Sequence, residues 1–277
     1  MFFKTSTIAA VAALLRAGEA LPPARNDSVN GVPAIGKRWL DCNRPVQGLS
    51  QDDCQHMSKI GFGSMGKNSD HDNGAIWVGG DGPTTFTFTN RADEGVTVVM
   101  WLQTDYKSSF VNVRQPYVTY SLPSPGDAVT VSAAQGISGA FAALHRDTTL
   151  RDGHIFNTWG EWSTGPYATV DVSRLPNMDG DRIEIETPGG CRANMDRCVF
   201  TCKRASRCGA SGEYSLQSCE AHSQAGNPHI GHDHQFVIPV GASERTRNSE
   251  ADNLSRGNPT GGCGGFENGG HVTVGLF

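Results

Sequence analysis

Carboxylates at close spacing between residues 161 and 181 are the side chains of this 277-residue chain best suited to chemistry. Glu161 follows a Trp-Gly pair, Asp171 lies in the middle of an apolar run, and Asp179 stands beside a glycine. Carboxyl groups brought into one cleft repel each other, which raises the pKa of one of them, and glycoside hydrolysis requires such a pair. The opposing interpretation is that Glu161 and Asp171 accept backbone hydrogen bonds and are structural.

Tryptophans beside Glu161 are candidates for sugar binding. Trp159 and Trp162 flank this carboxylate, and exposed tryptophan rings stack on sugar rings. We therefore predict that they form a sugar-facing patch. Trp101, in contrast, stands in a long apolar run and is predicted to lie in the core.

A group of histidines near the C-terminus is a candidate metal site. His229, His232 and His234 have a spacing at which imidazoles can bind zinc or copper together. The segment follows Gly-Asn-Pro in a polar stretch, which favours a solvated loop. We predict no metal site and no cofactor. The sequence also lacks a nucleophile elbow, a P-loop, a dinucleotide fingerprint and a His-Glu-x-x-His motif, so an ordinary hydrolase or redox enzyme has no support.

The N-terminal segment has the features of an export signal. Lys4 precedes an apolar run, and small residues follow it, which predicts a signal peptide over residues 1–20. Residues 21–38 are rich in Pro and Gly and end in a dibasic pair, which predicts a pro-segment cut before Trp39, the alternative being an uncut arm. Asn26 and Asn253 stand in glycosylation sequons, and the cut would remove the first.

The cysteine count agrees with export. An even number behind a signal peptide predicts a disulfide framework, although eight cysteines allow 105 pairings. The alternative is structural zinc, but the spacing lacks the paired Cys-x2-Cys of common zinc modules. Five of the eight fall within residues 191–219, which predicts a locally stapled, loop-rich appendage. The eight are Cys42, Cys54, Cys191, Cys198, Cys202, Cys208, Cys219 and Cys263.

The charge balance argues against two classes of partner. The chain has 23 basic and 28 acidic residues, and residues 1–38 hold five of the basic and two of the acidic ones. Residues 39–277 then carry 18 basic and 26 acidic residues, a formal charge of −8. Phosphate backbones and anionic lipids repel such a protein, so we expect no nucleic-acid or membrane partner.

The hydrophobic pattern is that of strands. Residues 84–89 alternate polar and aromatic side chains, and residues 96–102 form a continuous apolar run. Short strands separated by Gly, Pro, Asn and Asp predict an all-β sandwich with one domain over residues 39–277. No segment keeps a helical period over three turns. Further strands are expected at 111–120, 128–131, 140–144, 168–172 and 182–186, an edge strand at 271–277, and a polar tail at 241–268 that Cys263 ties back.

A series of short motifs resembles thaumatin-like proteins. Residues 86–90 (FTFTN) and 96–101 (VTVVMW) are similar to that family's opening hairpin. The motifs that follow in the family's order are GAFAALHRD at 139–147, Glu161-Trp162, YATVDVSR at 167–174, the Asp179-Gly180 turn and Cys191. Residues 157–161, 198–202 and 261–264 are also similar to a fungal group of secreted, effector-like relatives of thaumatins.

The resemblance implies a fold and a site. It implies a thaumatin-like β-sandwich with a disulfide-rich loop appendage, in which Glu161, Asp171 and Asp179 line an acidic cleft and Arg146 is a cationic partner. In that family the cleft is associated with β-1,3-glucan binding and weak glucanase activity.

These observations together predict a secreted fungal protein, effector-like or cell-wall-associated, and monomeric. We expect it to act by binding a cell-wall polysaccharide, such as β-glucan, or a host extracellular protein. The alternative is a weak endo-β-1,3-glucanase that uses the acidic cleft, and a third possibility is a purely structural wall protein.

Overall fold

The computed structural model describes residues 40–105, 107–219, 223–224 and 261–277. The predicted signal peptide and pro-segment, the sequons at Asn26 and Asn253, and the histidines His229, His232 and His234 lie outside the described residues. These interpretations stay predictions.

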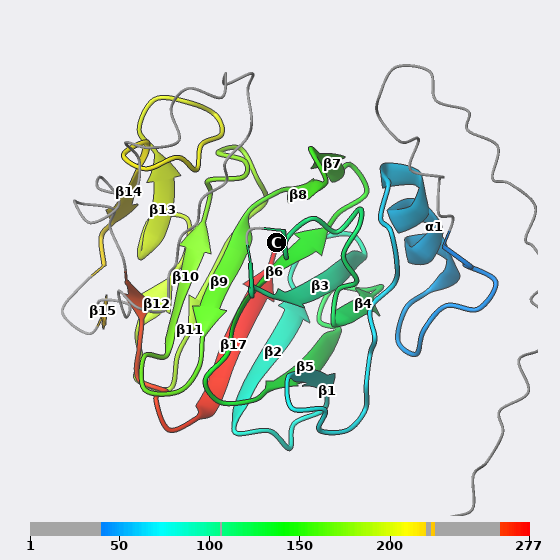
Figure 1. The fold of residues 1–277 in the computed structure, drawn as a ribbon, viewed down its shortest axis with the longest axis horizontal. Helices are drawn as coiled ribbons and strands as arrows, with labels where there is room; N and C mark the ends of the chain where they lie inside the picture. The colour runs from blue at the N-terminus through cyan, green and yellow to red at the C-terminus, as the bar shows by residue number, and fades with distance from the viewer. Residues whose placement is uncertain (1–39, 106, 220–222, 225–260) are drawn as a thin grey trace, which may run out of the picture. The chain divides into compact units, whose positions relative to one another are not determined.

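The described chain folds as a β-sandwich, which confirms the all-β prediction (Figure 1). Its smaller sheet has six strands, and β17 lies in its middle, parallel to β2 and antiparallel to β11. In spatial order these strands are β1 (Ile76–Val78), β5 (Ala128–Ala133), β2 (Thr84–Asn90), β17 (Gly270–Leu276), β11 (Ile183–Glu186) and β12 (Arg192–Ala193).

The larger sheet has nine strands and carries the predicted carboxylates. Its main path runs through β14 (Tyr214–Gln217), β13 (Val199–Cys202), β10 (Thr169–Ser173), β9 (Trp159–Ser163), β6 (Ser138–Leu144), β3 (Val96–Leu102) and β4 (Val118–Leu122). Two short strands, β15 (Ser223–Gln224) and β16 (Gly262–Cys263), join it beside β10. A separate hairpin consists of β7 (Thr149–Arg151) and β8 (His154–Phe156).

The main core lies between the two sheets. Successive residues of a strand point to opposite faces, so Phe86 and Phe88 of β2 enter this core while Thr87 and Thr89 point outward. β3 is apolar on both faces because Val98 and Met100 join the main core while Val99 and Trp101 join a second cluster on the other side of the sheet. The predicted core position of Trp101 is thereby confirmed.

Two expectations about pairing are wrong. Residues 86–90 and 96–101 do not form a hairpin, because β2 belongs to the six-stranded sheet and β3 to the nine-stranded sheet. The C-terminal strand β17 is central instead of an edge strand. A strand like β2, apolar on one face, suits a sheet with one solvated side, whereas a uniformly apolar strand like β3 suits a sheet covered on both sides.

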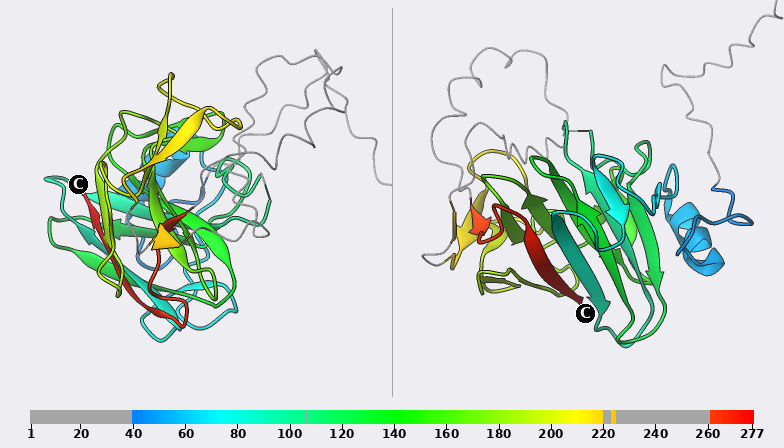
Figure 2. Two further views of the ribbon diagram at one scale, coloured as in Figure 1. Left: turned by 90° about the vertical axis from the view of Figure 1, so that its left-hand side faces the viewer. Right: turned by 90° about the horizontal axis from the view of Figure 1, so that it is seen from below.

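The helix α1 (Gln51–Ile60) was missed because its ten residues fall short of three turns. Ser50 caps it by accepting a hydrogen bond from the Asp53 backbone nitrogen, and Gly61 ends it in the left-handed conformation at φ 106°. Its buried face, Cys54 and Met57, packs on the nine-stranded sheet in the second cluster with Trp101 and Trp159. Figure 2 shows α1 in blue, at the opposite end of the sandwich from the yellow β13–β14 hairpin.

Every described cysteine is paired, which confirms the predicted disulfide framework. Cys42–Cys54 ties α1 to the segment before it, and Cys198–Cys219 and Cys202–Cys208 staple the predicted appendage internally. Cys191–Cys263 joins the appendage to β16, beside β10, as expected for Cys263. Among the described residues, no helix is long and apolar enough to span a membrane.

The bridges should differ in their contribution to stability. Cys191 and Cys263 are 72 residues apart in sequence, and Cys202 and Cys208 are 6 apart. Closing a longer loop restricts the unfolded chain more, so the serine double variant C191S/C263S should lose about 2 kcal/mol more free energy of unfolding than C202S/C208S. Urea denaturation of both variants measures this difference, and equal losses or the reverse order would contradict the expectation.

Candidate functional site

Glu161 and Asp171 face each other across neighbouring strands. Glu161 of β9 is directly opposite Asp171 of β10 in the antiparallel register. Directly opposite residues have Cβ atoms about 5 Å apart and point to the same side of a sheet. The register continues through Ala140 of β6 to Trp101 of β3. We call these four residues, Trp101, Ala140, Glu161 and Asp171, the acidic row.

The two carboxyl groups are closed to solvent. Glu161 is 1% exposed and Asp171 is 3% exposed. Gln103 donates a hydrogen bond of 3.3 Å from Nε2 to Oε1 of Glu161. Gly262 packs beside Asp171 so closely that a Cβ on this glycine would lie 2.8 Å from the Val170 carbonyl oxygen and 3.4 Å from the Asp171 Cβ. The sequence reasoning identified both carboxylates but missed Gln103 and Gly262.

Burial and the facing carboxylate change the proton affinity of Asp171. Burial, and then the negative charge of Glu161, raise the pKa of Asp171 well above its ordinary value of 3.8. A carboxyl group in this state keeps its proton and donates a hydrogen bond where an ionised carboxylate only accepts. The predicted mutual repulsion is therefore present for this pair.

Asp179 does not join the pair. It is exposed, and its backbone nitrogen bonds to Asn177 Oδ1 within its own turn. The turn lies against the start of β9, since the Asp181 backbone nitrogen bonds to Asn157 Oδ1 at 2.7 Å. Asn157 precedes Glu161 by four residues, which is about 13 Å along an extended strand. The expectation of a three-carboxylate cleft is wrong for Asp179.

Arg146 is not a cationic partner of Glu161 and Asp171, which corrects that expectation. Its side chain is 85% exposed, and its Nε lies 3.5 Å from Glu94 Oε2. Its neighbour His145 is buried, with Nδ1 3.4 Å from Glu94 and Nε2 3.6 Å from Asp181. This histidine thus lies between the carboxylates of two different loops. The sequence analysis did not single it out, although it stands directly before Arg146 in the motif at 139–147.

The predicted sugar-facing tryptophans are both buried, which corrects that expectation. Trp159 and Trp162 are each 0% exposed. Trp162 points into the main core, where its ring centroid lies 5.3 Å from that of Phe86. Trp159 lies in the second cluster in edge contact with Trp101, at 4.9 Å between ring centroids. Adjacent residues of a strand face opposite sides, so Trp162 cannot share a face with Glu161.

The cysteines do not offer a metal site. The sulfur atoms of Cys191, Cys198 and Cys263 lie within 4.8 Å of one another, but each is part of a disulfide. A metal-binding thiolate would require these bridges to be reduced.

Comparison of the sequence with protein families and with curated proteins identifies no relative. No protein-family model matches the chain, and no curated protein matches it. The thaumatin-like resemblance therefore stays a prediction.

The raised pKa of Asp171 predicts a pH dependence of stability. Between pH 3.8 and the raised value, Asp171 is protonated when folded and ionised when unfolded, so the free energy of unfolding falls as pH rises through this window. Asp171→Asn removes this loss, so the variant should gain stability relative to wild type as pH rises from about 4 to about 8. Thermal or urea unfolding across this range measures the gain.

The pH dependence of the wild type alone does not isolate Asp171, because a buried histidine changes the free energy of unfolding with pH in the opposite direction. The stability of D171N must therefore be compared with that of the wild type at each pH. Burial, and then Arg207, lower the pKa of His154 to about 4, which favours folding as pH rises above that value. Asp179→Asn is the matched control because the same change is made at an exposed aspartate. A stability difference between D171N and wild type that does not change with pH would contradict the raised pKa.

Proposed function

We propose that this is a secreted protein that acts outside the cell by binding a neutral wall polysaccharide, a β-glucan, at the acidic row. The disulfides support the extracellular location, because such bridges form and persist in oxidising compartments. The ligand class follows from the polar groups of the row and its neighbours.

A set of buried polar atoms on one sheet face carries the proposal. Trp101 Nε1, Asp171 Oδ1 and Ser173 Oγ are buried and have no hydrogen-bond partner among the described residues. Trp101 and Asp171 lie in the same row, and Ser173 follows two residues after Asp171 and so shares its face. A buried polar atom left unpaired costs about 1–3 kcal/mol, so such a set calls for a partner from outside the chain.

A sugar chain offers matching groups. The indole nitrogen donates, the Ser173 hydroxyl donates or accepts, and the protonated Asp171 can do both. Ala140 separates Trp101 from Glu161 in the row. Sugar hydroxyls alternate as donors and acceptors, and a neutral chain avoids repulsion by Glu161. Because the row is closed to solvent, a ligand enters only after local opening of this face.

The second candidate function is weak β-1,3-glucan hydrolysis. The direct cross-strand pairing of Glu161 with Asp171 favours it, since retaining glycosidases hold their two carboxyl groups about 5–5.5 Å apart. Catalysis also needs an open groove that admits both substrate and water, and the burial of the pair counts against this. Binding is therefore the leading proposal.

Substitutions at Asp171 separate binding from hydrolysis. If Asp171 acts as a neutral hydrogen-bonding group, asparagine keeps both a donor and an acceptor in nearly the same shape. We therefore expect D171N to retain pull-down by insoluble β-1,3-glucan, D171A to lose most of it, and the wild type to release no reducing ends from laminarin. Chitin and cellulose serve as comparison polymers, and melting temperatures verify that each variant is folded.

Two outcomes would contradict the proposal. Wild-type protein that is not retained on β-1,3-glucan would refute this ligand. Reducing-end release that disappears in both D171N and E161Q would establish the hydrolase instead, because these variants keep the shape and remove the ionisable group.

A further inference from the structure

The outward face of the six-stranded sheet is rich in hydroxyl groups and is not used by the acidic row. Phe86 and Phe88 point into the core, whereas the alternating Thr87 and Thr89 point outward. The register extends this face as rows across the sheet. One row runs Thr130, Thr87, Thr273, Glu186 and Arg192, and the next runs Ala128, Thr89, Gly275 and Glu184.

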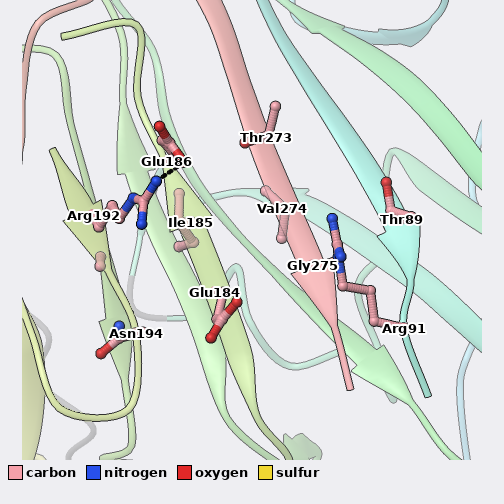
Figure 3. Close-up of a pocket in the computed structure, with 11 residues that line it drawn as sticks. Thr89, Arg91, Glu184, Ile185, Glu186, Arg192, Asn194, Thr273, Val274 and Gly275 are labelled. Carbon is pink, nitrogen blue, oxygen red and sulfur yellow. Dashed lines mark ion pairs between the residues drawn. The ribbon is translucent and has the colours of Figure 1, made fainter. Parts of the chain in front are cut away.

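A groove of about 380 Å³ lies on this face, over β2, β17, β11 and β12. We call it the sheet groove. Figure 3 shows Arg91 on one side of it and Glu184, Glu186 and Arg192 on the other, with Thr273 and Gly275 of β17 between them. Its volume lies at the small end of the range for ligand sites, about 300–1,000 Å³.

Gly275 gives Arg91 its place over the groove floor. A Cβ at position 275 would lie 3.0 Å from Arg91 Cδ and 3.1 Å from Arg91 Nε. It would also lie 3.1 Å from the Phe277 ring. The arginine side chain therefore rests on bare backbone, and a side chain at position 275 would force it to shift. The backbone nitrogen of Arg91 bonds to the Leu276 carbonyl at the end of β17, which fixes the base of this side chain.

The charges of the sheet groove leave one cation unbalanced. Arg192 Nη2 lies 3.2 Å from Glu186 Oε2, and Arg182 forms an ion pair with Glu184. Arg91 forms no ion pair with any carboxylate among the described residues and is exposed. Two glutamates and three arginines thus leave a single positive charge, at Arg91.

We propose that the sheet groove binds a hydroxyl-rich ligand with one carboxylate, such as a uronic acid unit of an acidic polysaccharide. The Arg91 guanidinium matches a carboxylate with two parallel hydrogen bonds. The hydroxyls of Thr89 and Thr273 and the carboxylates of Glu184 and Glu186 then pair with the sugar hydroxyls. This goes beyond the proposed function, because the site lies on the other sheet and takes a charged ligand.

One carboxylate fits this groove better than a phosphate ester. A dianion would bring a second negative charge against Glu184 and Glu186, with only Arg91 left to balance it. A neutral sugar would leave the Arg91 charge without a partner. The charge balance therefore selects a monoanion.

Isothermal titration with galacturonate, which carries one carboxylate, tests the proposal at low ionic strength. The wild type should bind galacturonate, and Arg91→Ala should weaken binding at least tenfold because it removes the charge. Arg91→Lys keeps the charge without the two parallel donors and should weaken binding severalfold. Arg44→Ala, an equal charge change at an exposed arginine outside the groove, should bind as the wild type does.

Two further ligands identify the group that is recognised. The methyl ester of galacturonate, which is neutral, and glucose 6-phosphate, which is a dianion, should each bind at least tenfold more weakly than galacturonate. Equal binding by R91A or by the ester, or tighter binding of the phosphate, would overturn the proposal. Retention of R91A on β-1,3-glucan reports separately on the acidic row, so failure of one proposal is distinguishable from failure of the other.

Discussion

Two carboxyl groups that face each other on a buried sheet surface cannot both ionise at ordinary cost. The register of β9 and β10 places Glu161 opposite Asp171, and neither is more than 3% exposed. Burial penalises each charge, and the facing carboxylate adds repulsion, so Asp171 keeps its proton to a higher pH than a free aspartate does. A neutral acid beside a carboxylate offers both a donor and an acceptor, and other buried polar atoms on the same face lack a partner, which supports our proposal of a neutral sugar chain as the ligand.

The two sheets use their outward faces differently. The outward face of the nine-stranded sheet packs on α1 at Trp101 and Trp159, and the two carboxyl groups of the acidic row are buried as well. The outward face of the six-stranded sheet carries threonines and paired charges, and a groove opens on it. An enclosed neutral acid and an open groove with one unbalanced arginine suit different ligands, which is why we assign a neutral glycan to one and an acidic sugar to the other.

Local patterns in the sequence predicted where the strands lie, but not which strands pair with each other in the sheets. The alternation in β2 and the continuous apolar run in β3 identify both strands and their burial, because side-chain period is a local property. The central place of β17 and the separation of β2 from β3 depend on pairing between distant residues, which no local pattern encodes. At the site, the sequence correctly identified Glu161 and Asp171 as a pair. Asp179 was wrongly added to them, because its position depends on the conformation of its turn, which the sequence did not reveal. The error at Trp162 was avoidable, since strand alternation alone turns it away from Glu161.

The protonation of Asp171 is the central claim, and a site-resolved titration tests it most directly. Carbon-13 NMR of the side-chain carboxyl groups, with D171N to assign the signal, follows Asp171 across the pH range. The account predicts that Asp171 remains protonated well above pH 3.8. Ionisation of Asp171 near its ordinary value would contradict the account, because the row would then carry two adjacent charges and lose its neutral donor.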